Sequence, residues 1–387
     1  MLLKNKTIAI IGGGPSGLTL TKLLQLKGAN VKVYERDLNK DARVQGSPLD
    51  LHFESGLKAI EVAGLMDSFK ANYSPGADKA RVVDENATIF YEHNEESRGT
   101  FGDKWFSPEI DRFALRKILL DSLQSDTVVW DSHIVAIENI NNTWQIIFKN
   151  GNTAVADIVI GADGANSTIR SFVTPIKPFY SGVTFLQCKI YDTEKNDQNI
   201  HSFLNDGKIM ALGDSKTLTV VAKGDGSIGF GASWKIDANW RIDSGIDFKN
   251  NIQVLEWFKK EYSKWGSIWQ ELFEYEKSDF IPRPLYCMPL DQYWEAKPTI
   301  TLIGDAAHLM PPFAGEGVNM AMLDAVQLSE NLTSEKFTDL KSAIADYEKQ
   351  MFARFSEIGK ITMFNTGWMH SPDGLKKMME RFKQLPN

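Results

Sequence analysis

Short apolar runs alternate with helical apolar spacing towards both ends of the chain. Runs at Lys6–Ile11, Asn30–Tyr34 and Thr299–Ile303 are typical of buried strands. Helical spacing follows at Pro15–Lys27 and from about Val318 to Leu332. Strands that alternate with helices form parallel sheets with helices on their faces. The two ends therefore predict an α/β domain.

The middle of the chain changes to a period of two. After Pro175, apolar and polar residues alternate in segments separated by turn residues, which predicts a mainly antiparallel sheet inserted as a second domain. These segments are Val183–Ile190, Ile209–Leu212, Leu218–Ala222 and Ile228–Trp234. Other expected strands are Val82-Val83, Ile89–Tyr91, Thr127–Trp130, His133–Ile140, Thr143–Phe148 and Ala156–Ile160. Other expected helices are Ser55–Ala63, Asp111 to Leu123, Ile252–Trp269, Leu340–Phe355 and Gly374–Phe382.

Composition narrows the class of protein. The 387 residues carry a net charge of −7, which argues against a general role on nucleic acid or an anionic membrane. Cys188 and Cys287 form no C-x-x-C pair, which suits a reducing compartment. The first strand begins too early for a signal peptide, and no apolar run is long enough to span a membrane. We expect a cytoplasmic and monomeric protein. We also expect no metal site, because the histidines do not show the spacing of metal ligands.

The first glycine-rich turn carries the clearest chemical signal. Gly12, Gly14 and Gly17 fit G-x-G-x-x-G between a strand and a helix, with Pro15 and Ser16 between them. The motif predicts a tight turn at Gly12, close approach of a pyrophosphate at Gly14 and close helix packing at Gly17. Glu35 follows the next strand, where an acid holds a ribose hydroxyl. The alternative is a purely structural turn.

A second glycine-rich turn lies far along the chain. The segment G-D-A-A-H-L-M-P-P-F-A-G-E-G-V-N-M-A, residues 304–321, follows a buried strand and leads into a helix. Two helix starts of this kind suit a longer cofactor, whose ADP half lies at the first turn and whose redox ring lies against Pro311–Asn319. Asp305 at the strand end is placed to accept from ribityl hydroxyls. This arrangement predicts bound FAD.

Arginines near these turns are candidate phosphate ligands. Asp111 is a plausible helix N-cap, which puts Arg112 in the first turn. A cation there is unfavourable for the helix dipole unless an anion binds. For Arg116, an exposed salt bridge is an equal alternative. Arg36 fits either an adenine or phosphate contact or a solvated surface position.

Three ordered motifs resemble those of single-component FAD-dependent aromatic hydroxylases with the p-hydroxybenzoate hydroxylase fold. They are G-G-G-P-S-G at 12–17, G-A-D-G-A-N-S-T-I-R at 161–170 and G-D-A-A-H-L-M-P-P-F-A-G-E-G-V-N at 304–319. Within that family, Y-E-R-D, L-D-L-H, L-R-K-I-L-L-D-S-L and D-T-V-V-W-D most resemble the tetracycline-inactivating flavin monooxygenases.

The resemblance implies an NADPH-using monooxygenase that acts through a flavin hydroperoxide. One oxygen atom of O₂ would enter an aromatic, phenolic or enolic small molecule, including tetracycline-like polyketides and hence antibiotic inactivation. NADPH contact is implied at Arg43. The implied cofactor contacts are Gly12, Gly14, Pro15, Ser16, Gly17, Glu35, Arg36, Asp50, Arg112, Asp163, Asp305, Pro312, Gly315, Gly317, Val318 and Asn319.

The implied substrate contacts lie on the antiparallel sheet and two further segments. A glutamine, an arginine and a histidine hold the substrate in the tetracycline enzymes, and these positions match Gln187, Lys208 and Gly229. Lysine keeps the charge without the planar fork, and glycine offers no imidazole, so tetracycline is a doubtful substrate. The family's usual glutamine between the two glycines is here Glu316. Further pocket candidates are Met210, Phe230, Phe313 and Met369, and for each of them a purely structural position in the core is at least an equal alternative.

The expected domains follow from this resemblance. FAD-binding parts are 1–68, 99–175 and 291–358, substrate-domain parts are 69–98 and 176–290, and 359–387 is a C-terminal helical segment. A flavin oxidoreductase without oxygen transfer should carry a second G-x-G-x-x-G domain, which the sequence lacks. A flavin-dependent halogenase would want a W-x-W-x-I-P segment, also not found. A substrate-sequestering FAD-binding protein stays open as an alternative.

Overall fold

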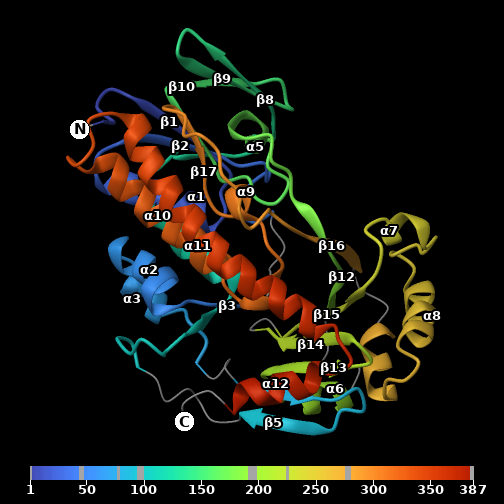
Figure 1. The fold of residues 1–387 in the computed structure, drawn as a ribbon. Coiled ribbons are helices and arrows are strands. Elements are labelled where there is room, and N and C mark those ends of the chain that lie inside the picture. The colour runs from blue at the N-terminus through green and yellow to red at the C-terminus, as the bar shows by residue number, and fades with distance from the viewer. Residues whose placement is uncertain are drawn as a thin grey trace. The chain divides into compact units, whose positions relative to one another are not determined.

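A computed structural model describes residues 2–42, 48–75, 79–93, 100–190, 198–223, 226–274 and 280–383. The chain divides into two compact units (Figure 1). The first unit comprises Met1–Tyr73, Thr100–Phe179 and Cys287–Ile361. The second comprises Ser74–Gly99, Tyr180–Tyr286 and Thr362–Asn387, so the C-terminal residues that the sequence sets apart fall into this unit.

A parallel sheet forms the centre of the first unit. Its strand order is β17-β11-β1-β2-β7, and all four neighbouring pairs are parallel. The central strand β1 is buried along most of its length, as parallel strands covered on both faces are. The strands are β1 (Thr7–Ile11), β2 (Asn30–Tyr34), β7 (Val128–Val129), β11 (Ile158–Gly161) and β17 (Ile300–Leu302).

Helices α1 (Pro15–Leu26) and α10 (Gly317–Thr333) pack against each other in the first unit, side by side in Figure 1. Both are buried along most of their length, which explains why their apolar residues spread around the helix. Helix α4 (Arg112–Asp121) packs on α1, and Asp111 caps it by accepting from the Phe113 and Ala114 amides, as predicted. The first unit also contains β3 (Leu49–Asp50), η1 (Phe53–Leu57), α2 (Lys58–Val62), α3 (Met66–Lys70), β6 (Glu109–Ile110), β8 (Ile134–Ile140), β9 (Thr143–Phe148), β10 (Thr153–Ala156), α5 (Arg170–Val173), α9 (Asp305–His308) and η4 (Pro312–Ala314).

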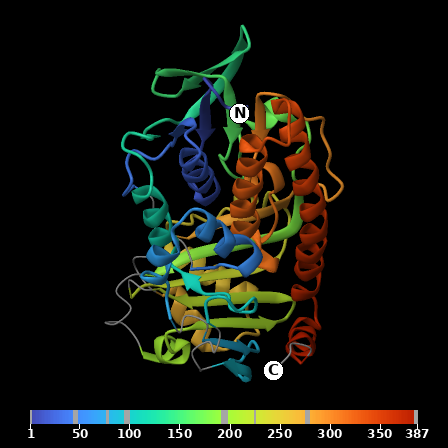
Figure 2. The ribbon, with the colours of Figure 1, turned by 90° about the vertical axis from the view of Figure 1, so that its left-hand side faces the viewer.

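A seven-stranded sheet forms the second unit, with the order β16-β12-β15-β14-β13-β4-β5. Its yellow-green strands lie side by side in Figure 2. The pairs β12–β15, β15–β14, β14–β13 and β4–β5 are antiparallel and β13–β4 is parallel, which confirms a mainly antiparallel sheet. One face is apolar and packs on an aromatic core that includes Trp234, Phe258 and Trp269. The strands are β4 (Ala80–Val83), β5 (Ile89–His93), β12 (Phe179–Ile190), β13 (Lys208–Gly213), β14 (Lys216–Ala222), β15 (Ile228–Lys235) and β16 (Ile281–Cys287).

Helix boundaries differ from the sequence prediction in two places. The prediction of a single helix at Ile252–Trp269 is wrong. Helix α8 (Asn251–Glu261) ends before that range is complete, and a separate 3-10 helix, η3 (Ser267–Phe273), follows it. Gly266 separates them, and its N–H donates to the carbonyl of Glu85. Helix α11 (Leu340–Met369) runs well past its predicted end. The remaining helices are α6 (Gln198–Leu204), α7 (Trp240–Asp243) and α12 (Gly374–Phe382).

Strand β16 is absent from the sequence prediction because Pro282 and Pro284 interrupt the apolar pattern. A proline cannot donate to a strand ladder and is therefore confined to edges. The first place of β16 in the strand order makes it such an edge. Across the described ranges, no helix combines the length and apolar character that crossing a bilayer requires.

Candidate functional site

The first glycine turn joins β1 to α1, and sterics fix two of its glycines. Gly12 has φ +110°, and an added Cβ would lie 2.3 Å from the carbonyl oxygen of Ala162. A Cβ on Gly17 would lie 2.2 Å from the carbonyl oxygen of Gly12. Both distances are impossible, so the tight turn and the close packing require glycine at these positions.

Gly14 has a different reason for being glycine. Its φ of −81° suits any residue, and an added Cβ would meet no protein atom within 4 Å. Gly14 is the N-cap of α1, whose first amides have no partner within the helix. The open space therefore lies where a helix N-terminus binds an anion, which fits a pyrophosphate.

Glu35 follows β2 and is 2% exposed. Its carboxylate accepts from the Gly13 N–H at 2.5 Å and from the Asp37 N–H at 3.1 Å. Glu35, which is expected to bind a ribose, thus also stabilises the glycine turn through its bond with Gly13. A ribose contact stays a prediction.

Arg116 is buried, with an exposed fraction of 4%, so the alternative of an exposed salt bridge is wrong. Its guanidinium donates to the Asp37 carboxylate at 3.1 Å and to the Lys40 carbonyl at 2.9 Å, and it lies over the Trp130 ring. Arg36 is exposed, and Arg112 is half-buried at the first position of α4. Arg43, expected to contact NADPH, lies outside the described residues.

The second glycine turn mirrors the first. Gly315 adopts φ +73°, which favours glycine. Gly317 begins α10, and an added Cβ there would meet no atom within 4 Å. Asp305 is exposed at the first position of α9, three residues after β17, while Ala306 beside it is buried. Pro312 is exposed, and Phe313 and Val318 are half-buried.

Asn319 is fully buried and serves the protein rather than an open site. Its side-chain oxygen accepts from the His52 N–H at 2.9 Å and from the Gly56 N–H at 3.2 Å. Its amide donates to the Asp50 carbonyl at 2.9 Å. Because Asn319 exposes no surface, it does not fit the predicted direct contact with the cofactor. Its side chain instead binds residues 50–56 to the first turn of α10.

A charged triad lies beside that turn. His52 Nε2 is 3.1 Å from Asp50 Oδ2, and His52 Nδ1 is 3.2 Å from Glu316 Oε1. Hydrogen bonds to Asp50 and then to Glu316 raise the pKa of His52 to about 10. The sequence missed this contact, although an imidazole two residues after Asp50 in L-D-L-H was a signal.

The motif at residues 161–170, which contains Asp163 and Gly164, is also structural in part. Asp163 accepts from the Ser167 hydroxyl at 2.5 Å and from the Thr168 N–H at 2.7 Å. Arg170 donates to the carbonyls of Asp305 at 2.8 Å and Ala306 at 2.7 Å. The motif therefore holds the short turn before α5 and, through Arg170, the segment that carries Asp305.

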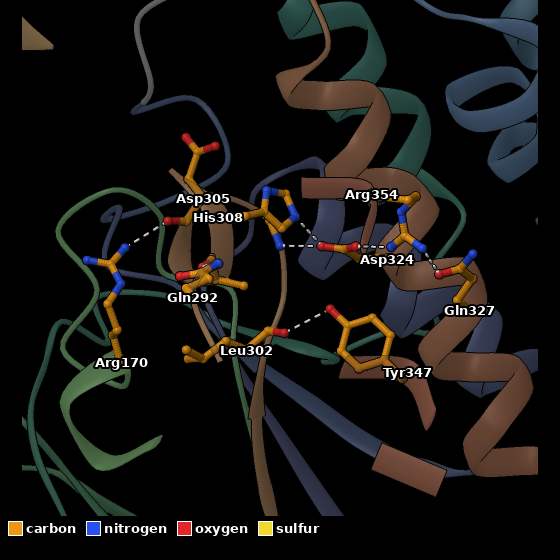
Figure 3. A network of polar contacts seen from close by, with 11 residues as sticks. Arg170, Gln292, Leu302, Asp305, His308, Asp324, Gln327, Tyr347 and Arg354 are labelled. Atoms are coloured by element: carbon orange, nitrogen blue, oxygen red, sulfur yellow. Dashed lines mark hydrogen bonds and ion pairs between the residues drawn. The ribbon is translucent and has the colours of Figure 1, made fainter. Parts of the chain in front are cut away.

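A buried network fixes the other side of that segment (Figure 3). His308 Nε2 lies 2.6 Å from Asp324, which also accepts from the Gly304 N–H at 2.8 Å and from Arg354 at 2.7 Å. Burial opposes ionisation of Asp324, but His308 and Arg354 hold its pKa below the usual value. Gln292 donates to the Ala307 carbonyl at 3.0 Å. His308 is thus an anchor of the Gly304 turn.

The second unit brings several predicted substrate residues onto one sheet face. Gln187 pairs with Gly231, Gly231 with Thr219, and Thr219 with Met210 across β12, β15, β14 and β13. Because side chains alternate along a strand, Lys208 and Gly229 share that face. A Cβ on Gly229 would lie 2.8 Å from Lys223 Cε, so this lysine fills the space beside Gly229.

Phe230 lies on the opposite face, which corrects the prediction that groups it with Gln187. It is 4% exposed and packs on Phe273 and Phe280 in the aromatic core. Arg283 was missed: it is exposed on β16 and donates to Gln187 Oε1 at 2.7 Å. Met369 is buried at the end of α11.

The donors of the first unit fit FAD. Gly14 and Gly317 each leave open space at the start of a helix. Two carboxylates follow strands of the parallel sheet: Glu35 comes directly after β2, and the exposed Asp305 comes three residues after β17. The sequence profile described as "FAD binding domain" matches residues 5–212 and 294–350, more than half of the chain. The chain is a FAD-dependent monooxygenase of this family. Within the described ranges, no group of three or more histidine, cysteine or acidic side chains could hold a metal ion.

Relatives of this monooxygenase extend over its whole length. Monooxygenase penA of Penicillium thymicola is 26% identical, over 96% of this chain and 97% of its own. Klebsiella pneumoniae HpxO, complexed with FAD and uric acid, has a TM-score of 0.77 at 17% identity, over 99% of this chain and 94% of its own. The tetracycline destructase Tet(51) has a TM-score of 0.73 at 19% identity, over 99% of both chains. The last two likenesses show the fold alone, so the tetracycline enzymes are distant neighbours among several.

Proposed function

We propose that this monooxygenase takes electrons from NADPH and inserts one oxygen atom into an aromatic, phenolic or enolic small molecule. The two glycine helix starts, with Gly14 as the N-cap of α1 and Gly317 as the first residue of α10, best support it, because free amides at each start can hold part of a long cofactor. Bound FAD supplies the redox and oxygen chemistry, and the protein supplies binding, orientation and shielding from water.

The residues of the first unit divide this work. Amides at the start of α1 receive the pyrophosphate, Glu35 accepts from the adenosine ribose, and Asp305 accepts from the ribityl chain. With the flavin ring at the Gly315–Gly317 turn, the positive end of α10 would favour negative charge on it. Helix α1 has no acidic residue in its first turn to compete with a bound anion, whereas α10 carries Glu316 at its N-cap.

The substrate is proposed to lie on the sheet face that carries Gln187, Lys208 and Met210. Gln187 is already oriented by Arg283, so the pair presents an amide and a guanidinium together. Phe313 and Met369 stay proposed contacts that supply apolar surface. A polar site of this kind discriminates by the groups it would leave unpaired with a wrong substrate.

The test is NADPH oxidation by the purified yellow protein across a panel of tetracyclines and phenolics, with product masses read under ¹⁸O₂. We expect faster flavin reduction with the true substrate and a product heavier by one labelled oxygen. Reduction without labelled product would favour an oxidoreductase that transfers no oxygen. Tight substrate binding without NADPH oxidation would favour a sequestering protein. Purified protein that never retains FAD would contradict the whole proposal.

Tetracycline turnover has its own test. The double variant Lys208→Arg with Gly229→His should raise it if these positions match those of the tetracycline enzymes. Because Lys223 fills the space beside Gly229, Lys223→Ala should be added in parallel. No gain in either background would contradict the matched positions while leaving the monooxygenase assignment intact.

A further inference from the structure

The two ring nitrogens of His52 face two different carboxylates, which determines the protonation of the ring. A neutral imidazole has one donor and one acceptor nitrogen. It would therefore leave a lone pair facing either Asp50, at 3.1 Å, or Glu316, at 3.2 Å. Only the imidazolium donates to both. The triad of Asp50, His52 and Glu316 consequently carries a net charge of −1 instead of −2.

The triad joins two separate stretches of the first unit. Asp50 ends β3, and Glu316 is the N-cap of α10, between Gly315 and Gly317. An added Cβ on Gly315 would lie 3.9 Å from Asp50 Oδ2, so the carboxylate lies against this turn. The three side chains are 28% (His52), 45% (Asp50) and 26% (Glu316) exposed, so solvent screens them only in part.

We propose that His52 is a positioning residue of the flavin site, which holds the Gly315–Gly317 turn against Asp50 and offsets the charge of Glu316 at the start of α10. The inference rests on the proposed location of the flavin ring at that turn. Reduction makes the bound ring more negative, and a cation close to it favours the reduced form. The imidazolium therefore acts on flavin affinity and on flavin potential through Glu316.

A double-mutant cycle of His52→Gln and Glu316→Gln tests this inference. FAD affinity is measured by flavin fluorescence on reconstituted apoprotein, and the midpoint potential by dye equilibration. We expect His52→Gln to weaken FAD binding roughly tenfold, or about 1.4 kcal/mol, and to make the potential more negative. Glu316→Gln alone should make the potential more positive. In the Glu316→Gln background, the effect of His52→Gln should become much smaller.

Additive effects of the two substitutions on both readouts would overturn the inference. His133→Gln, which changes an exposed histidine of the same unit, is the matched control and should leave affinity and potential unchanged. If the His52 variant does not fold, nitrogen chemical shifts of the wild-type imidazole decide instead. Both nitrogens should carry protons at pH 8, and a neutral ring would overturn the inference. Wild-type protein that fails to bind FAD would contradict the proposed function, whereas additive variants of a FAD-binding wild type contradict this inference alone.

Discussion

Two glycines at helix starts of the first unit differ from two glycines on β15 of the second unit in what surrounds them. Before α1 and α10 in the first unit, Gly14 and Gly317 leave space that no protein atom fills. On β15 in the second unit, the space beside Gly229 and Gly231 is filled by the chain itself. A Cβ on Gly231 would lie 1.8 Å from the ring of Phe185. The glycines at the helix starts leave open space, while those on the strand make room for neighbouring side chains.

The largest difference between a closed and an open glycine is expected within the first turn, between Gly12 and Gly14. Gly12→Ala combines φ +110° with a 2.3 Å clash, so we expect it to cost about 4 kcal/mol of unfolding free energy or to prevent folding. Gly14→Ala should leave the urea unfolding midpoint of the apoprotein unchanged but weaken FAD binding at least tenfold. Equal destabilisation by both would contradict the distinction between steric and ligand glycines.

The second unit offers the matching test at Gly231. Gly231→Ala should destabilise the protein by about 3 kcal/mol, since the added methyl group overlaps the Phe185 ring. Gly231→Ala with Phe185→Ala should recover part of that loss relative to Phe185→Ala alone. Chemical denaturation of all four proteins measures the coupling. Additive losses would mean that Phe185 is not what excludes a side chain.

A buried acid in the first unit adds a pH test. Burial raises the pKa of Glu348 to about 7, although the Thr301 hydroxyl donates to it at 2.7 Å. The unfolded pKa is lower, so stability is lost as pH rises from about 4.5 to 7. We expect Glu348→Gln to be about 2 kcal/mol more stable than wild type at pH 8 and equal to it near pH 4.5. Glu357→Gln, exposed on the same helix α11, should change neither value.

A buried histidine in the second unit should show the reverse dependence. Burial lowers the pKa of His370 to about 4, and the neutral ring bonds the Ser233 hydroxyl at 2.7 Å and the Thr366 carbonyl at 2.8 Å. Its contribution is complete above about pH 6.5 and lost as pH falls towards 4. Between pH 7 and 5 the wild type should lose about 1 kcal/mol more than His370→Gln in urea unfolding. Equal losses would show that protonation of His370 is not coupled to unfolding.

The sequence predicted the turns of the first unit better than the substrate face of the second unit. The cofactor turns depend on residues close together in the chain, so Gly12, Gly17 and the Asp111 cap could be assigned correctly. The substrate face depends on register between strands, which the sequence does not contain. Even so, a period of two forbids Gly229 and Phe230 from sharing a face, so that error was avoidable. The contacts of Asn319 with residues 50–56 and of Arg283 with Gln187 join distant segments, and no local pattern predicts them.

The bonds of Asn319 have a consequence for engineering this enzyme. Residues 50–56 and the first turn of α10 are more than 260 positions apart, yet the side-chain amide of Asn319 on α10 satisfies backbone groups of Asp50, His52 and Gly56. A loop exchange with a relative that replaces only one of these segments would strand buried donors. Chimaeras that retain both segments from one parent should fold, and recombination breakpoints should therefore be chosen by this pairing rather than by position along the chain.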